Sequence, residues 1–152
     1  MTTHRDLPTI PTRDKESRVN GYLFPIANQF EGTGPFSLGK PVQQVYATTI
    51  LPGAIKGPHL HLRRSGFFTP LVGEVAFVIR RGPTDFDVQY ASRAKPRTIY
   101  VPAGVPSAMV NVGEGEAVVL NVVESAWRPE DPDDEPVPDF RFDFSTLKRI
   151  TS

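Results

Sequence analysis

An all-β fold of the sandwich, barrel or jelly-roll type is the architecture that this sequence predicts. The 152 residues include 16 prolines and 12 glycines, which interrupt the chain too often for long helices. Roughly eight or more short runs, rich in β-branched and aromatic residues, follow one another at regular spacing. No convincing helical pattern precedes the last residues. The length and an apolar content of 39% fit one domain with its own core.

Three regions follow one another along the chain. Residues 1–20 are polar, and we expect an irregular arm that packs on, or exchanges with, the second subunit of a homodimer. Residues 21–127 hold the predicted barrel. Residues 128–152 begin with an acidic, proline-rich stretch, which predicts an extended and solvated loop. They end in a C-terminal tail whose phenylalanines alternate with charged residues, which indicates a terminal strand or an ordered segment.

The predicted strands lie within the barrel region. The first long one, residues 42–51, reads VQQVYATTIL and ends at a Pro-Gly turn. The run VAFVI at 75–79 is typical of a buried strand. Residues 107–112 and 117–123 are predicted to form a strand pair, joined by the Gly-Glu-Gly turn at 113–115. Further strands are expected at 86–90 and 97–101, and a loop is expected at 27–41.

Composition narrows the possible functions. The chain has 17 basic and 17 acidic residues, and a formal net charge of zero does not suggest a nucleic-acid or membrane-surface protein. It has no cysteine, which excludes disulfides, thiolate nucleophiles and Cys-ligated zinc. No apolar signal region or membrane-length segment is present. We therefore expect a cytoplasmic protein that binds a small molecule, with no nucleic-acid or membrane partner.

Two of the three histidines lie close together as His59-Leu60-His61, in the centre of the stretch 53–73. Residues i and i+2 of a strand point to the same face, so a strand here would direct both imidazoles one way and Leu60 the other. A histidine pair on the inner face of a barrel suits proton transfer or metal binding. The alternative is a pair of barrel-lining side chains without a chemical role.

The spacing of this stretch resembles the first cupin motif, in which a glycine precedes His-x-His, and a glutamate and a second glycine follow. The matching positions are Gly53, His59, His61 and Gly73. The glutamate position is occupied by Gly66, or by Ser65 at the shorter spacing. This resemblance, which covers roughly residues 42–124, implies the cupin double-stranded β-helix, a jelly roll.

The second cupin motif, Pro-x-Gly followed by a histidine and an asparagine, is also recognisable. Pro102, Gly104 and Asn111 match it, and Ser107 occupies the histidine position. A cupin metal site uses four side chains, two of which are missing here, and two imidazoles alone make a weak site. We therefore expect no metal and no cofactor; substitute ligands remain an open alternative at Glu74, Glu124 or Asp87.

Among cupins, the metal-free nucleotide-sugar enzymes are the most similar. Residues 56–61, Lys-Gly-Pro-His-Leu-His, resemble the Arg-Gly-x-His-Ala-His signature of dTDP-4-keto-6-deoxyglucose 3,4-ketoisomerases. They also resemble the Arg-Gly-x-His signature of dTDP-4-dehydrorhamnose 3,5-epimerases. This resemblance implies that His59 is the general base and that Lys56 contacts a diphosphate. The tyrosine acid of the epimerases is replaced near Asn121, and their second-motif histidine is replaced by Ser107.

The predicted function is therefore metal-free isomerisation or epimerisation of a keto-sugar nucleotide. His59 would abstract a proton beside the ketone, His61 would assist, and a tyrosine could stabilise the enediolate. The candidate catalytic residues are His59, His61, Tyr46 and Tyr100, although either tyrosine could instead be a core or rim residue. The candidate substrate-binding residues are Lys56, Arg63, Phe68, Ser107, Met109 and Asn121, whereas Arg64 is expected to be a surface charge.

Two other functions fit the same pattern. A cyclase or isomerase of an apolar secondary metabolite would use the phenylalanines and Met109 as its pocket. A non-catalytic cupin that has lost its metal ligands would bind a ligand and leave it unchanged.

Overall fold

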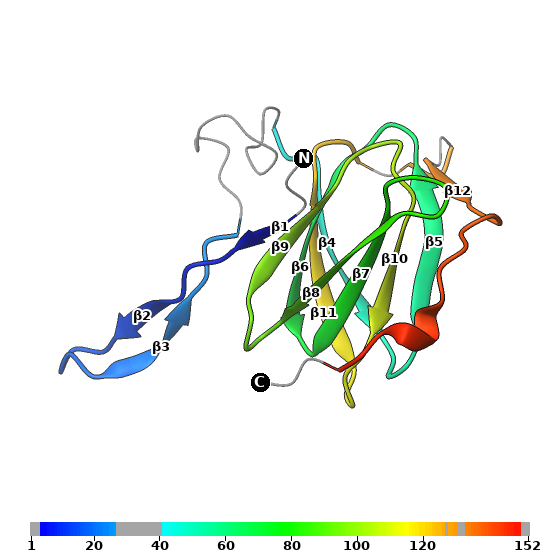
Figure 1. The fold of residues 1–152 in the computed structure, drawn as a ribbon. Coiled ribbons are helices and arrows are strands. Elements are labelled where there is room, and N and C mark those ends of the chain that lie inside the picture. The colour runs from blue at the N-terminus through cyan, green and yellow to red at the C-terminus, as the bar shows by residue number, and fades with distance from the viewer. Residues whose placement is uncertain (1–3, 27–40, 127, 131–132, 150–152) are drawn as a thin grey trace.

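Two antiparallel five-stranded sheets face each other and form the jelly roll that the sequence predicts (Figure 1). The computed structural model describes residues 4–26, 41–126, 128–130 and 133–149. The first sheet has the order β1-β9-β6-β11-β4, and the second has the order β12-β5-β10-β7-β8. No helix in the described ranges is long and apolar enough to cross a membrane. The predicted loop at 27–41 lies almost wholly outside those ranges.

The elements have the following bounds: β1 His4–Asp6, β2 Ile10–Arg13, β3 Val19–Leu23, β4 Gln44–Ile50, β5 Ile55–His61, β6 Gly66–Val72, β7 Glu74–Arg80, β8 Phe86–Ser92, β9 Arg97–Val101, β10 Ser107–Asn111, β11 Ala117–Val123, β12 Asp134–Pro136, and the 3₁₀ turn η1 Phe144–Thr146.

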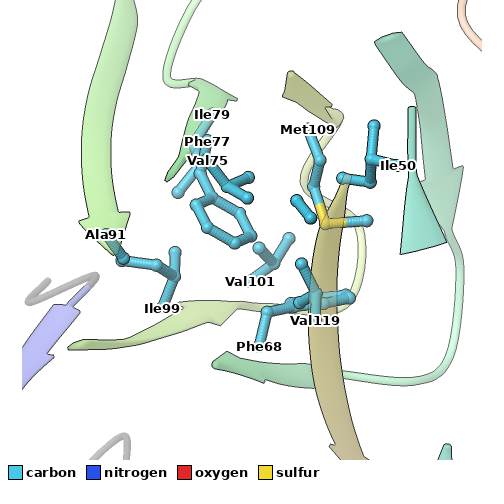
Figure 2. Packing of buried hydrophobic residues seen from close by; sticks show 11 residues of the cluster. Ile50, Phe68, Val75, Phe77, Ile79, Ala91, Ile99, Val101, Met109 and Val119 are labelled. Atoms are coloured by element: carbon cyan, nitrogen blue, oxygen red, sulfur yellow. The ribbon is translucent and has the colours of Figure 1, made fainter. Parts of the chain in front are cut away.

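The core lies between the two sheets and is built by alternate residues of the facing strands. On β4 the inward side chains alternate with exposed ones, as expected for a strand with one buried face. On β7 five consecutive residues are buried, because this strand is also covered on its outer side. Figure 2 shows Phe77 of β7 among side chains from both sheets, including Phe68, Val119 and Met109. Dense apolar packing of this kind makes the barrel a rigid support for the histidine strand.

The predicted pairing of the strands at 107–112 and 117–123 is wrong. β10 pairs with β5 and β7, and β11 pairs with β4 and β6, so the two strands lie in opposite sheets. A jelly roll alternates between its sheets, and a short glycine-rich connection can turn the corner as readily as it can close a hairpin.

The N-terminal region is more ordered than predicted. β1 adds to the edge of the first sheet by pairing with β9. β2 and β3 form a hairpin that projects away from the barrel (Figure 1). The hairpin therefore runs through Leu23 and past the predicted end of the arm at residue 20. Its apolar residues Ile10, Val19, Tyr22 and Leu23 are each roughly half exposed.

The acidic C-terminal region is not the solvated loop that its composition predicts. β12 lies beside β5 and extends the second sheet by one strand (Figure 1). Asp133 directly before it is buried. The phenylalanines that follow do not form a strand. The rings of Phe140 and Phe142 instead pack at 5.1 and 5.2 Å from the ring of Phe86, which closes one side of the barrel.

Candidate functional site

β5 directs both histidines into the space between the two sheets. His59 is in register with Ser107 of β10, and Ser107 shares a face with the core residue Met109. His61 follows two residues later on the same face, and the ring centroids of His59 and His61 are 5.2 Å apart. The predicted pairing of the imidazoles on one face is therefore present in the fold. His59 is half-buried, and His61 is buried.

A bulge in β5 brings Lys56 to the histidine face. The register with β10 shifts so that Lys56 is opposite Met109 and His59 is opposite Ser107. Gly57 lies in the bulge at φ +94°, and a Cβ there would lie 3.0 Å from the carbonyl oxygen of Ser107. A side chain at this position would therefore be strained. The ammonium of Lys56 crosses the interior and donates to Thr48 Oγ1 of the opposite sheet at 2.6 Å.

The opposite wall carries a polar pair in an otherwise apolar core. Asn121 Nδ2 donates to the Tyr46 hydroxyl at 2.6 Å, across the register of β11 and β4. Asn121 is only 1% exposed, and its Oδ1 has no hydrogen-bond partner among the described residues. A buried acceptor without a partner costs free energy, so this atom is suited to receive a hydrogen bond from a ligand or a water molecule. A Cβ at Gly66 would lie 3.2 Å from the same Oδ1 and 2.5 Å from the Phe68 ring.

The C-terminal strand holds His61 through its carboxylate. Asp134 is in register with His61, and its Oδ1 lies 2.5 Å from His61 Nδ1. A carboxylate only accepts hydrogen bonds, so Nδ1 carries the proton and donates it, which leaves the Nε2 lone pair as the basic atom. Arg64 Nη2 donates to the same Asp134 oxygen at 3.2 Å and lies 3.3 Å from His61 Nδ1. This contact between His61, Arg64 and Asp134 is called the His61 triad below.

A second aspartate fixes the loop that carries Arg64. The backbone N–H groups of Arg63 and Arg64 both donate to the Asp133 carboxylate at 3.0 Å. Burial of this carboxylate opposes ionisation, but these two backbone hydrogen bonds, with the Arg63 charge, hold the pKa of Asp133 below its usual range. Asp133 therefore stays ionised and keeps the loop closed against the tail.

The electrostatic environment favours neutral imidazoles. Burial lowers the pKa of His59, and the charges of Arg64 and Lys56 act in the same direction, whereas Asp134 opposes them. Burial and Arg64 likewise lower the pKa of His61, against the opposing charge of Asp134. A neutral imidazole can accept a proton, so both side chains are in the state that a general base needs near neutral pH.

Eight of the ten predicted site residues border the interior between the sheets. Tyr46, Phe68 and Asn121 belong to the first sheet, and Lys56, His59, His61, Ser107 and Met109 belong to the second. Phe68 and Met109 are buried within the main core cluster.

Tyr100 lies outside this interior, contrary to the prediction. Its neighbours Ile99 and Val101 both pack in the core, so the alternation of β9 turns Tyr100 to the outer face. There its ring packs 5.1 Å from Phe67, and its hydroxyl donates to Ser65 Oγ at 3.4 Å. The alternation in the sequence separates Tyr100 from the apolar residues at 99 and 101, but it does not by itself show which face is turned to the core.

The two arginines after β5 exchange the roles that the sequence predicts. β5 ends at His61, so the alternation does not continue to Arg63, whose exposed guanidinium lies 3.7 Å from Asp133. Arg64, predicted to be a surface charge, is only 7% exposed and contacts His61. The sequence offers no local signal for this, because the partner Asp134 is 70 residues away.

The cupin metal set is incomplete in the described part of the chain, where no group of three or more His, Asp or Glu side chains is arranged to hold an ion. Two of the three candidate substitutes, Glu74 and Asp87, have other contacts: Glu74 accepts from Arg149, and Asp87 accepts from Gln89. The described part of the chain does not assemble Glu124 with other His, Asp or Glu side chains into a metal-binding group. The residues present therefore do not fit a metal site of the usual cupin type.

A family model matches residues 38–135, which is well over half of the chain, and it is described as the polysaccharide biosynthesis C-terminal domain. The chain belongs to this family. No curated protein matches at a significant level.

Solved structures of this jelly-roll type include several nucleotide-sugar enzymes. A dTDP sugar isomerase from Desulfovibrio desulfuricans is 17% identical, with a TM-score of 0.74 over 95% of this chain and 91% of that one. The sugar 3,4-ketoisomerase QdtA from Thermoanaerobacterium thermosaccharolyticum, in complex with TDP, is 20% identical, with a TM-score of 0.64 over 91% and 90% of the two chains.

A third similar structure is the capsular polysaccharide assembling protein CapF from Staphylococcus aureus. It is 24% identical, with a TM-score of 0.59 over 62% of this chain. The match covers 26% of the CapF chain, so the present chain spans about a quarter of CapF there. At these identities the likeness establishes the fold, which is a cupin-type jelly roll.

Proposed function

We propose that the protein isomerises a keto-sugar nucleotide by proton transfer at a carbon next to the ketone. The observation that carries the proposal is the pair of half-buried and buried imidazoles on the inner face of β5, one of which is held by Asp134. QdtA, which shares the fold, is a sugar 3,4-ketoisomerase, and a histidine-to-asparagine mutant of it was crystallised with TDP-4-keto-6-deoxyglucose. That parallel supports the substrate class.

In the proposed reaction, His59 removes the proton from C3 of a 4-keto sugar. The electron pair of the C3–H bond forms a C3–C4 double bond, and O4 takes up the negative charge as an enediolate. Transfer of the O3 proton and return of a proton to C4 give the 3-keto product. If the proton returns to C3 from the opposite face instead, the product is the C3 epimer. Both outcomes need one base, one proton donor and a stabilised oxyanion.

The other side chains in the interior match these needs. His61 shares the face of His59, and its Nε2 can return or relay the proton because Nδ1 is bonded to Asp134. The ammonium of Lys56 lies close enough to His59 to influence its pKa, and it could stabilise the enediolate oxygen. The amide of Asn121 can accept a hydrogen bond from a sugar hydroxyl through its Oδ1, which has no partner in the part of the chain that the structure describes. We propose that the reaction needs no metal, since the serine at 107 and the Ser65–Gly66 pair replace two metal ligands.

The test is proton NMR in D₂O with a thymidine-diphospho-4-keto-6-deoxyhexose, together with metal analysis of the purified protein. Deuterium entering at C4 of a 3-keto product, or at C3, in the wild type, and not in His59→Asn, is the expected result. No exchange in a metal-free sample would overturn the proposal and favour a non-catalytic binding protein or an enzyme with another substrate. A stoichiometric metal that is required for exchange would overturn the metal-free mechanism alone.

We also propose that the protein is a homodimer in which the β2–β3 hairpin packs on the second subunit. An isolated two-stranded hairpin is marginally stable in water, and this one has about half of each of four apolar side chains exposed. Light scattering after gel filtration should give twice the chain mass. The double variant Tyr22→Glu, Leu23→Glu should give the monomer mass, and a monomeric wild type would refute this interpretation.

A further inference from the structure

A pocket whose wall is rich in arginine lies beside Arg64, which contacts His61. It has a volume of about 210 Å³ and lies between the loop after β5, the start of β4 and the region after β11. Its lining includes Gln43, Arg63, Arg64, Ser125, Arg128 and Asp133. We propose that this arginine pocket binds the diphosphate of the substrate, a nucleoside diphosphate sugar. The inference rests on the proposed function, since it assigns the anionic half of the same substrate.

The charge of the lining favours a multivalent anion. Three guanidiniums and one carboxylate line the pocket, and Asp134 beside it pairs with Arg64, so the arginines exceed the carboxylates by one formal positive charge. The Asp133 carboxylate already accepts from the backbone N–H groups of Arg63 and Arg64. Guanidinium groups present a planar set of N–H donors that match phosphate oxygens in pairs. A diphosphate therefore satisfies both the charge and the hydrogen-bonding capacity of the wall.

The size of the pocket suits part of a ligand. Sites for whole small molecules usually have about 300–1,000 Å³, and 210 Å³ is smaller than that range. The lining is also mainly polar, as expected for a phosphate subsite and not for a nucleobase or an apolar metabolite. The sugar would then extend from the arginine pocket into the interior that carries the histidines.

Arg64 connects the arginine pocket to the reacting atoms. It lines the pocket, and its Nη2 lies 3.3 Å from His61 Nδ1. In a nucleotide sugar the diphosphate is bonded to C1, and C3 is only two carbon atoms further along the ring. A diphosphate anchored beside Arg64 would therefore hold C3 and C4 near the imidazoles of β5. In this placement Arg63 would bind the diphosphate at the rim of the arginine pocket. Lys56 points into the interior, away from the proposed diphosphate site.

The pocket is tested by calorimetric titration with thymidine diphosphate, inorganic pyrophosphate and thymidine. Wild-type protein should bind thymidine diphosphate, pyrophosphate should compete with it, thymidine should bind far more weakly, and added salt should weaken diphosphate binding. Arg128→Ala and Arg63→Ala should each reduce the affinity for thymidine diphosphate about 10- to 100-fold, the usual effect of losing a charged hydrogen-bond partner.

Arg149→Ala is the matched control. Arg149 pairs with Glu74 and Glu114 at the turns before β7 and β11, away from the lining of the arginine pocket, so its loss should leave the affinity unchanged. Arg63 and Arg128 are exposed, so circular dichroism and the thermal midpoint should show that their variants remain folded. The buried Arg64 is left intact because its removal could disturb the fold.

Different outcomes separate this inference from the proposed function. If both arginine variants bind thymidine diphosphate as the wild type does, or if the wild type binds no diphosphate, the arginine pocket is refuted even when deuterium enters at C3. If the variants lose affinity but no exchange occurs with any keto-sugar nucleotide, the diphosphate site stands and the isomerase proposal falls.

Discussion

Replacing Asp134 by asparagine should test the contact that holds His61. The substitution keeps the size of the side chain and removes the charge that accepts the proton of His61 Nδ1 at 2.5 Å. A hydrogen bond to a charged group contributes about 1.5–3 kcal/mol. Asp134 is 43% exposed at its side chain, so screening by water reduces this contribution. We therefore expect a loss of about 1–2 kcal/mol, equivalent to a rate of exchange at C3 lower by a factor of about 5–30.

The assay is the rate of deuterium incorporation as a function of pH. Burial is the largest effect on the pKa values of His59 and His61 and lowers both, whereas Asp134 raises both, so removal of Asp134 should lower both values further. The acidic limb of the pH–rate profile should then move to lower pH, while KM changes little. A purely structural role of Asp134 would not move the profile.

Glu135→Gln is the control for this experiment. Glu135 is the exposed neighbour on β12, in register with Leu60 on the other face of β5, and it loses the same charge. It should leave both the rate and the pH profile unchanged, and Asp134→Glu should restore part of the rate. If Asp134→Asn exchanges deuterium at the wild-type rate with an unshifted profile, the role assigned to the His61 triad is wrong.

Three further predictions concern stability and electrostatics. Folding lowers the pKa values of His59 and His61, so the unfolded chain binds more protons than the folded chain below pH 6.5. The free energy of unfolding should therefore fall as the pH decreases from 6.5. Urea titrations at several pH values should show a smaller fall in the double variant His59→Asn, His61→Asn. Lys56→Met removes a cation that lowers the pKa of His59, so the acidic limb of the pH–rate profile should move to higher pH and the exchange rate should fall. Gly57→Ala places a Cβ at positive φ, 3.0 Å from the Ser107 carbonyl oxygen, and should lower the free energy of unfolding by about 1–3 kcal/mol. The thermal midpoint should then be several degrees lower. An unchanged midpoint would mean that the bulge relaxes freely.

The sequence predicts the parts of the site that depend on local periodicity. His59 and His61 share a face because residues i and i+2 of any strand do so, and the glycine and proline positions around them indicate the jelly roll. The same reasoning fails for Tyr100, because the strand period gives alternation but does not state which set of residues faces the core. The fully buried Ile99 resolves this only when the fold is known.

The remaining parts depend on pairings between distant segments, which local patterns do not contain. The acidic stretch after residue 130 has the composition of a solvated loop, and read alone that composition gives no reason for a strand. What makes β12 a strand is the open edge of β5, which supplies backbone partners. The backbone N–H groups of Arg63 and Arg64 also bind Asp133, and the Arg64 guanidinium pairs with Asp134. In turn, Arg64 is buried and Arg63 is ordered only because Asp133 and Asp134 lie beside them.

This mutual dependence has a consequence for the chemistry. The strand that completes the second sheet also supplies Asp134 to His61, and Asp133 beside it shapes the arginine pocket. Docking of the C-terminal segment therefore sets the tautomer of His61 and the position of two arginines in one step. The acidic segment therefore has a clear physical reason to be charged: an apolar strand could cover the edge of β5, but it could not hold an imidazole with its proton on Nδ1 or keep Arg64 beside it.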